Sequence, residues 1–354
     1  MRPMSTLNVA GRAVGGDSAA FLIAEAGVNH NGDMGRAREL VDIAADAGAD
    51  AVKFQTFDPA ALATRSAPIA DYQRRAGSDV GDQITMLERL ALDDDEFAQL
   101  AAHARDRGIV FLSSPFDERS AELLDRLDVA AFKVGSGELT NVGFLRRLAG
   151  YGRPMLVSTG MGTLDEVGAA VDAVTAGGAP GLALLHCVSS YPTPVDQANL
   201  RAIATLRDAF PAVPIGYSDH CLGIDVSLAA VALGACVLER HVTTDRTLPG
   251  PAHAASLEPG ELADLVVRVR AIESALGDGL KQPQSAERNT MAVARRSLVA
   301  ARDLPAGAVI AREDLAVKRP GGGLAPGLLE SVVGARLARP VTIDELLTAE
   351  HLQT

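Results

Sequence analysis

From residue 21 to about residue 276, the chain repeats one pattern: a short apolar run, a polar or glycine-rich turn and an amphipathic stretch. The apolar runs predict eight strands, at Phe21–Ala24, Ala51–Phe54, Ile109–Leu112, Ala130–Val134, Met155–Val157, Leu182–Leu185, Val213–Ile215 and Ala235–Leu238. The amphipathic stretches predict eight helices, at Arg36–Ala47, Asp95–Asp106, Glu118–Leu127, Asn141–Leu148, Leu164–Thr175, Leu200–Phe210, Ile224–Leu233 and Glu258–Leu276. Eight strand–helix units in about 250 residues have the size and rhythm of a (β/α)₈ TIM barrel. A doubly wound sheet is the alternative, but the first turn lacks a GxGxxG and eight regular units favour closure.

The connection from Thr56 to about Asp93 is long and has a helical piece of its own, at Gln83–Leu90. Long connections in compact domains are functional more often than short ones. We expect either a lid over the barrel mouth, to which Tyr72 would belong, or a decorated loop.

After Leu276 the pattern stops, and Pro and Gly punctuate short β-like runs at Ser297–Ala300, Val309–Ile310, Leu315–Val317 and Val332–Val333. We therefore predict a catalytic barrel domain at residues 1–280, a linker at 281–293 and a small β-rich domain at 294–354.

Composition limits the functions that this chain can have. A net charge of −12 argues against a nucleic-acid surface, although a few basic residues in one pocket still suffice for an anionic substrate. Three cysteines without a CxxC pair favour reduced thiols. With no signal-peptide pattern and no long apolar stretch, we expect a cytoplasmic protein without a membrane partner.

All eight predicted strands end in polar residues, at the barrel face where chemistry gathers in this fold. His220 and His241 follow neighbouring strands, so both can face one cavity and hold a metal with open positions. Arg240 alternates to the other face and is expected to pack against the surrounding helices. The less specific interpretation is structural: a strand-end histidine is often only hydrogen-bonded, and Glu25 or Glu239 could simply pair with a barrel lysine.

Basic and hydroxyl side chains add a second indication. Lys53 and Lys133, together with serines and glycine-turn N–H groups, have the composition of a phosphate and carboxylate cradle. These residues predict a metal-assisted enzyme that acts on an anionic, phosphorylated substrate. The serines in question are Ser114, Ser136 and Ser158.

Short motifs extend in order along nearly the whole chain. They are EAGVNHNG at 25–32, VKFQT at 52–56, SSPFD at 113–117, FKVGSGE at 132–138, STGM at 158–161, HCVSSYPTP at 186–194, GYSDH at 216–220 and ERHVT at 239–243. Together they resemble the sialic acid (nonulosonate) synthase family. The tail, with RRSLVAA at 295–301 and VKRPGGG at 317–323, resembles that family's antifreeze-like (SAF) domain.

The resemblance implies a transferase that condenses phosphoenolpyruvate with an open-chain N-acylated hexosamine, releasing phosphate by C–O cleavage. Its divalent metal, Mn²⁺ or Mg²⁺, would be held by His220 and His241. The family's phosphoenolpyruvate contacts match Lys53, Ser114, Lys133, Ser136, Ser158 and Ser218, and its acidic active-site positions match Glu25, Glu138 and Glu239. Sugar contacts match Gln55, Ser189 and Tyr191. Arg319, from the partner subunit of a swapped homodimer, would approach the N-acyl group.

Three departures from the family pattern bear on the substrate. Ser114 stands where Thr is frequent, which keeps the hydroxyl, and Ser189 stands where Asn is frequent, which shortens one contact. Ala252 replaces the acid of a Gly-Pro-Asp motif near the sugar hydroxyls, and His253 is either a second sugar contact or a loop residue.

Several alternatives remain open from the sequence. N-acetylmannosamine is the default sugar, and a diacetamido-trideoxyhexose leading to legionaminic or pseudaminic acid is the alternative. Two other interpretations explain fewer of the polar strand-end residues. One is a class I aldolase with a Schiff base on Lys133, and the other is a non-catalytic ice- or carbohydrate-binding protein. Which glutamate transfers which proton is not decided.

Overall fold

The computed structural model describes residues 6–70, 73–74 and 82–353 and divides the chain into two compact units, Met1–Gly277 and Asp278–Thr354. Tyr72 lies outside the described residues. Each unit has its own hydrophobic core. The domain boundaries at 280 and 293 stay a prediction.

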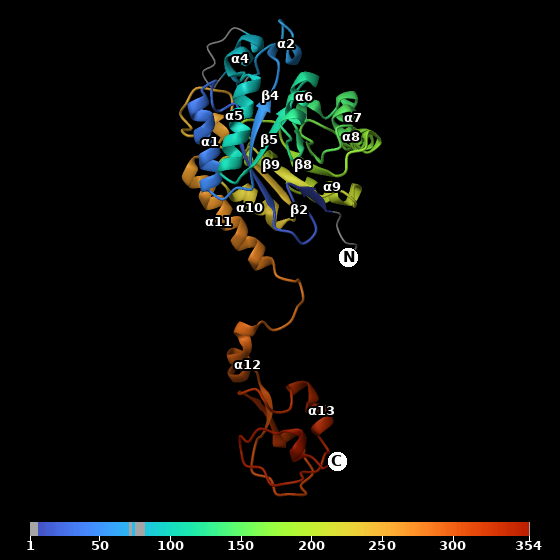
Figure 1. Ribbon diagram of the computed structural model, residues 1–354. Coiled ribbons are helices and arrows are strands. Elements are labelled where there is room, and N and C mark those ends of the chain that lie inside the picture. Colours follow the sequence, from blue (N-terminus) through green and yellow to red (C-terminus); the bar gives the residue numbers. More distant parts are fainter. Residues whose placement is uncertain (1–5, 71–72, 75–81, 354) are drawn as a thin grey trace. The chain divides into compact units, whose positions relative to one another are not determined.

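The first unit is a TIM barrel, which confirms the predicted fold class (Figure 1). Its parallel strands are hydrogen-bonded in the order β5-β4-β3-β10-β9-β8-β7-β6, and β5 and β6 at the two ends of this order are also neighbours, so the barrel is nearly closed. The strands are β3 (Phe21–Gly27), β4 (Ala51–Thr56), β5 (Val110–Pro115), β6 (Phe132–Val134), β7 (Met155–Ser158), β8 (Leu182–Cys187), β9 (Ile215–Asp219) and β10 (Val237–His241).

Helices surround these strands in the expected alternation, so all eight predicted barrel helices are present. Asp33, Asp93, Asp117 and Thr163 begin four of them by accepting a backbone N–H in the first turn. The helices are α1 (Met34–Asp46), α5 (Asp94–Asp106), α6 (Glu118–Arg126), α7 (Val142–Ala149), α8 (Leu164–Gly177), α9 (Ala202–Ala209), α10 (Asp225–Ala232) and α11 (Pro259–Leu276). The long connection after β4 carries α2 (Pro59–Leu62) and α4 (Gln83–Leu90).

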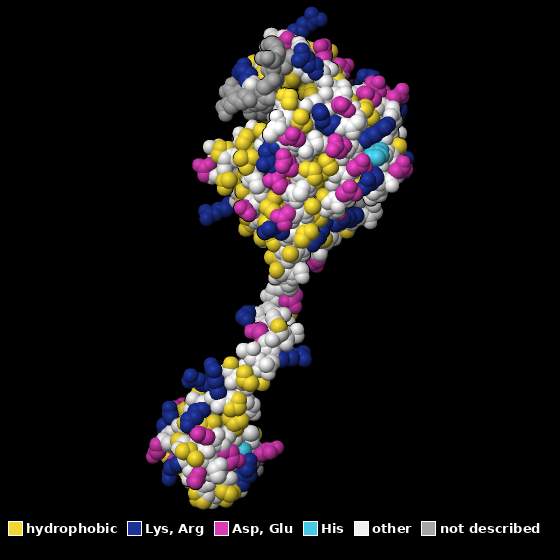
Figure 2. Space-filling model, turned by 90° about the vertical axis from the view of Figure 1, so that its left-hand side faces the viewer, with side chains coloured by type: hydrophobic (Ala, Val, Ile, Leu, Met, Phe, Trp, Pro, Cys, Tyr) yellow, Lys and Arg dark blue, Asp and Glu magenta, His cyan; other side chains and the backbone are white. Residues whose placement is uncertain are grey.

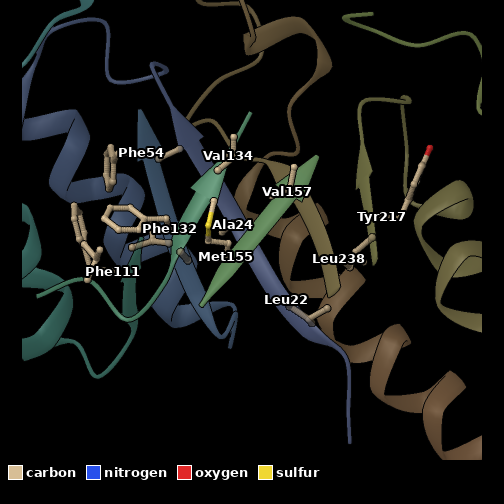
Figure 3. Close-up of a cluster of buried hydrophobic side chains, with 14 of the residues drawn as sticks. Leu22, Ala24, Phe54, Phe111, Phe132, Val134, Met155, Val157, Tyr217 and Leu238 are labelled. Carbon is tan, nitrogen blue, oxygen red and sulfur yellow. The ribbon is translucent and has the colours of Figure 1, made fainter. Parts of the chain in front are cut away.

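Apolar side chains fill the layer between strands and helices. Figure 3 shows part of this cluster, with Leu22, Phe54, Phe132 and Leu238 among the buried side chains. Over the barrel surface that Figure 2 shows, acidic and basic side chains are interspersed. In the described part of the chain, no helix is long and apolar enough to cross a membrane.

An N-terminal hairpin that the pattern did not predict covers the amino-terminal end of the barrel. It consists of β1 (Leu7–Val9) and β2 (Arg12–Val14), paired antiparallel. Its side chains Leu7, Val9 and Val14 are buried in one cluster with barrel residues such as Phe21 and Leu156. In Figure 1, the end of the barrel beside β2 lies opposite the end that carries α2 and α4. Strands of three residues are too short for a periodicity signal.

The second unit is a small domain with an antiparallel pair, β11 (Ser297–Ala300) and β12 (Leu315–Lys318), around a core that includes Leu298, Leu315 and Leu337. The predicted strand at Val332–Val333 is wrong, because Val332 ends the short helix α13 (Leu329–Val332). Two apolar β-branched residues do not distinguish a strand from a buried helix end. A further helix, α12 (Arg288–Ala294), begins in the segment predicted as linker and ends one residue beyond it.

The hairpin packing yields a first prediction. Val9 is fully buried, so Val9→Asp places an unpaired carboxylate in the apolar cluster and should lower the free energy of unfolding by about 3 kcal/mol or more. Asn8→Asp adds the same charge at the exposed neighbouring position and keeps the acceptor for the Gly11 N–H, so it should change stability by less than about 0.5 kcal/mol. Urea-induced unfolding measures both, and equal midpoints would show that the hairpin is not part of the folded core.

Candidate functional site

A chain of buried charges lies at the carboxyl ends of the barrel strands. Lys53 on β4 forms ion pairs with Glu25 on β3 and with Glu239 on β10, the latter at 3.3 Å between Nζ and Oε1. The other Glu239 oxygen, Oε2, lies 2.9 Å from the Nζ of Lys133 on β6. All four side chains are at most 5% exposed. Charges at this depth are compatible with a stable fold because each one has a partner of opposite sign.

The two carboxylates differ in protonation because they have different numbers of cationic neighbours. Burial raises the pKa of Glu25 to about 7, with the charge of Glu239 adding to this effect and the Lys53 ammonium opposing it. Burial alone would also raise the pKa of Glu239, but Lys133 and Lys53 together hold it well below its usual range. Glu239 is therefore a permanent anion, whereas Glu25 exchanges a proton near neutral pH.

Hydroxyl groups surround the two lysines. Lys53 donates to Ser114 Oγ at 3.1 Å, and Lys133 donates to Ser158 Oγ at 2.8 Å. Ser136 Oγ accepts from the N–H of Gly160 at 3.0 Å, and a side chain at Gly160 would collide with the hydroxyls of Ser136 and Ser189. The close approach of these groups therefore requires glycine.

Two more predicted residues adjoin this group. Ser218 is buried on β9, beside Glu239 in the strand register. Gln55 donates to Glu25 Oε1 at 3.3 Å. The barrel thus brings together both lysines, two of the three predicted glutamates and the predicted serines.

His220 and His241 lie next to one another at the same barrel mouth, with ring centroids 5.4 Å apart. The ring of Tyr191 adjoins both imidazoles. Its centroid lies 4.1 Å from the ring centroid of His220 and 5.7 Å from that of His241. Burial, together with the neighbouring His220, holds the pKa of His241 well below its usual range, so this imidazole is neutral.

The bonding of the two histidines fits ligands of a divalent metal. His220 Nδ1 donates to the carbonyl of Val188 at 2.8 Å, which leaves the lone pair on Nε2, and His241 Nδ1 is buried without a hydrogen-bond partner. Both features suit metal ligands. Within residues 6–70, 73–74 and 82–353, no three His, Cys, Asp or Glu side chains form a complete metal-binding group. The fit is therefore to a two-histidine site that leaves positions for substrate or water.

A small cavity of about 100 Å³ adjoins His241. Of the described residues that line it, six of ten are apolar, and three of these six come from α4. Gln55, Tyr191 and His241 provide polar groups, and Ala252 lies in the wall. Among residues that the structure describes, the lining consists of Val28, Gln55, Gln73, Met86, Leu87, Leu90, Tyr191, His241, Pro251 and Ala252. The lid interpretation of the long connection is thereby favoured, since α4 forms a wall of this cavity.

Three predicted site residues lie apart from this arrangement. Glu138 follows β6 in a short 3₁₀ helix, is half-buried and accepts from Asn141 at 2.8 Å, outside the chain of charges. His253 is fully buried and bonds Thr243 Oγ1 at 2.7 Å and Asn31 Oδ1 at 3.2 Å, which favours the loop interpretation over a sugar contact. Arg319 directly follows β12 in the second unit.

Two further buried residues, one beside His220 and one on the outward side of the barrel wall, received no role from the sequence. Cys187, one of three free and buried cysteines, has its Sγ 3.9 Å from His220 Nδ1. Asp219 on β9 is completely buried and paired with Arg240 on β10. The motifs at 186–194 and 216–220 include both residues, but a motif alone does not tell which side of the strand each one faces.

Comparisons with known proteins place these residues in context. Residues 40–281 match the NeuB family, and residues 295–353 match the SAF domain. The chain is 44% identical to the N,N'-diacetyllegionaminic acid synthase of Legionella pneumophila over 96% of each chain. It is 39% identical to the N-acetylneuraminate-9-phosphate synthase of Homo sapiens, over 96% of this chain and 94% of the human one. A crystal structure of N-acetylneuraminic acid synthetase from Leptospira borgpetersenii aligns with a TM-score of 0.72 at 35% identity, covering 82% of this chain and 97% of that one.

The raised pKa of Glu25 yields a second prediction. In the metal-free protein, the Glu25 carboxyl should pass from largely protonated to largely ionised between about pH 6 and about pH 8, far above an ordinary glutamate. Infrared difference spectra across this range should show loss of a protonated-carboxyl band. Glu25→Gln should abolish the band, and Glu138→Gln should retain it. A band that survives Glu25→Gln would assign the proton to another group.

Proposed function

The chain belongs to the NeuB family, and on that basis we propose that it condenses phosphoenolpyruvate with an open-chain N-acylated amino sugar, giving a nonulosonic acid and phosphate. The observation that carries this proposal is the alternation of Glu25, Lys53, Glu239 and Lys133 beside two histidines. Two fixed ammonium groups and several hydroxyls suit a small substrate that bears both phosphate and carboxylate.

The lysines and serines would bind and orient phosphoenolpyruvate. Glu239 bonds both ammonium groups, so it fixes their separation before the substrate arrives. Ser114 and Ser158 each accept a lysine hydrogen bond, which leaves their own O–H groups to donate to the anion. The buried position of these groups excludes water from the reacting atoms.

His220 and His241 are the proposed ligands of Mn²⁺ or Mg²⁺. When bound there, the cation would polarise the sugar aldehyde. In the overall reaction, C3 of phosphoenolpyruvate forms a bond with the aldehyde carbon, water adds at C2 and phosphate leaves with C–O cleavage. Glu25, with its pKa near 7, is the group placed to hold or release the proton that this sequence requires. Glu138 is the weaker candidate for this proton transfer, because its carboxylate accepts a hydrogen bond from Asn141.

The apolar cavity beside His241 favours a diacetamido-trideoxyhexose as the acceptor sugar. Such a sugar carries a second acetyl group and a methyl carbon where N-acetylmannosamine has hydroxyl groups. Val28, Met86, Leu87 and Ala252 offer apolar contacts and no carboxylate to a hydroxyl group. The Legionella pneumophila relative is named an N,N'-diacetyllegionaminic acid synthase, which supports a diacetamido sugar here. N-acetylmannosamine, the default from sequence alone, is the second candidate, supported by the polar groups of Gln55 and Tyr191 in the same cavity.

The amine chemistry of a class I aldolase fits the site less well. Lys133 Nζ lies 2.9 Å from Glu239 Oε2 and donates to Ser158, so its nitrogen is engaged by two partners and is not free to attack a carbonyl.

A homodimer in which the SAF domain of one subunit covers the barrel mouth of the other is part of the proposal. Exposed apolar side chains follow four successive strands at that mouth, after β6, β7, β8 and β9. They are Val142, Met161, Leu164, Val195 and Leu222, between 42% and 74% exposed. A rim of this kind fits a protein partner. Arg319 would then approach the acceptor sugar from the partner.

The sugar proposal is tested by phosphate release from phosphoenolpyruvate and Mn²⁺ across a panel of N-acetylmannosamine, its 6-phosphate and the diacetamido-trideoxyhexoses. We expect kcat/KM to be about 10-fold or more higher with a diacetamido sugar, and EDTA to abolish turnover. Ala252→Asp should lower that preference because it places a carboxylate against the apolar groups. Ala254→Asp, an exposed position on the same loop, is the matched control. Activity that persists after chelation, or substrate-dependent trapping by borohydride, would contradict the mechanism.

The dimer proposal has its own test. Arg319→Ala and His241→Ala should each impair turnover, and a mixture of the two variants should regain part of it, because hybrid dimers contain one intact pair of barrel and SAF domain. Native mass spectrometry verifies that subunits have exchanged. Absence of recovery in verified hybrids would show that Arg319 does not act across subunits.

A further inference from the structure

A buried ion pair lies on the outward side of β9, which His220 directly follows, and of β10, which ends in His241. Arg240 Nη1 is 2.6 Å from Asp219 Oδ2, and the two side chains are 2% and 0% exposed. The two residues are also direct partners in the register of β10 and β9. Each one immediately precedes a histidine in the sequence, Asp219 before His220 and Arg240 before His241. Because side chains alternate along a strand, the ion pair and the histidines occupy opposite faces of the barrel wall.

Asp219 uses both carboxylate oxygens to join three parts of the fold. Oδ1 accepts from the backbone N–H of Cys221 at 2.8 Å and from the hydroxyl of Tyr217 at 3.3 Å. Oδ2 accepts from the hydroxyl of Ser227, on α10, at 2.5 Å. The bond to Cys221 is the informative one, because it holds the backbone on the far side of His220. The carboxylate therefore fixes both peptide neighbours of that histidine.

Arg240 lies in an apolar layer. Its neighbours there include Leu22 and Ala24 on β3, Leu238 on β10, and Leu262 and Leu265 on α11. Apolar side chains of similar size would fill this layer without the cost of burying two charges. Apolar packing would not fix the orientation of one strand against the next, because hydrophobic contacts are non-directional. The short ion pair joins β10 to β9 at one point, and the hydrogen bonds of Asp219 hold that point to the Cys221 backbone and to α10.

We propose that Asp219 and Arg240 are positioning residues for the metal, which hold the imidazoles of His220 and His241 at the separation that one divalent cation requires. The inference rests on the proposed function. It assigns a role in metal affinity to side chains that face away from the cation.

The test is the Mn²⁺ dissociation constant of the resting enzyme, measured by electron paramagnetic resonance of free Mn²⁺ without substrates. Ser227→Ala removes one hydrogen-bond partner of Asp219. Arg240→Lys keeps the positive charge but loses the planar guanidinium group, and Asp219→Asn keeps the side-chain shape but loses the negative charge. We expect affinity to fall progressively along this series, by about 10- to 100-fold for Asp219→Asn, as with other residues that orient metal ligands. Circular dichroism and the melting temperature of each variant are recorded alongside.

Two controls separate positioning from general stability. Leu100→Ala opens a cavity in the buried face of α5, outside the site, and should lower the melting temperature while leaving Mn²⁺ affinity unchanged. The double variant Asp219→Leu with Arg240→Met replaces the pair by apolar groups, which should recover stability relative to the single variants. Its Mn²⁺ affinity should stay weakened, because the bond to the Cys221 N–H is gone.

Folded variants that bind Mn²⁺ as tightly as the wild type would overturn the inference, as would a double variant that recovers affinity together with stability. Either result would leave the proposed function intact, provided that the wild type binds Mn²⁺ and releases phosphate with a sugar of the panel. If the wild type binds Mn²⁺, the variants lose affinity and no sugar is turned over, then the reaction is misassigned and the positioning role stands.

Discussion

The chemistry of this barrel depends on one constraint: two lysines are buried in a protein interior and must remain charged. Burial alone would lower the pKa of Lys53, but Glu25 and Glu239 raise it above its ordinary value. Glu239 has the central place because it contacts both lysines at once. Its charge cannot be removed without leaving two cations to repel one another. The position of Glu25 and the orientation of Ser114 and Ser158 follow from that carboxylate. The neutral state of the neighbouring His241 has another origin, because burial and His220 lower the pKa of this imidazole against the opposing charge of Glu239.

The fold makes this arrangement possible because it places the ends of distant segments at one face. Lys53 and Glu239 are separated by most of the barrel sequence, yet β4 and β10 both flank β3 in the sheet. The β3–β10 register sets Glu25 beside His241, and the β10–β9 register sets Glu239 beside Ser218. A slip of one residue would turn every one of these side chains to the helix-facing side. The outward cluster shown in Figure 3 opposes such a slip, because Leu22, Ala24 and Leu238 would move into the polar interior.

Much of this was predictable from sequence, for physical reasons. Buried parallel strands appear as continuous apolar runs, and the polar residues that end them mark the active face, so the barrel and the grouping of Lys53, Lys133 and the serines could be predicted. The strand ends were less predictable. The predicted strand at Val213–Ile215 stopped where the apolar run stops, whereas β9 continues to Asp219, because residues with polar side chains still form the backbone hydrogen bonds of the sheet. The pairing of a barrel lysine with Glu25 or Glu239 was an expectation from the sequence, and the structure shows both pairs. Other side-chain partners were beyond the sequence. Nothing in the pattern shows that His253 is bonded at both ring nitrogens or that Glu138 bonds its neighbour Asn141.

The N-terminal hairpin closes the amino-terminal end of the barrel. Leu7, Val9 and Val14 pack there against apolar residues that fill the barrel interior, such as Ile23, Leu112 and Leu156. Under the proposed function, the ligands of Lys53 and Lys133 and of the cavity beside Ala252 would therefore approach from the end that carries the histidines. The hairpin thus gives the barrel a sealed floor, and with it a direction of access.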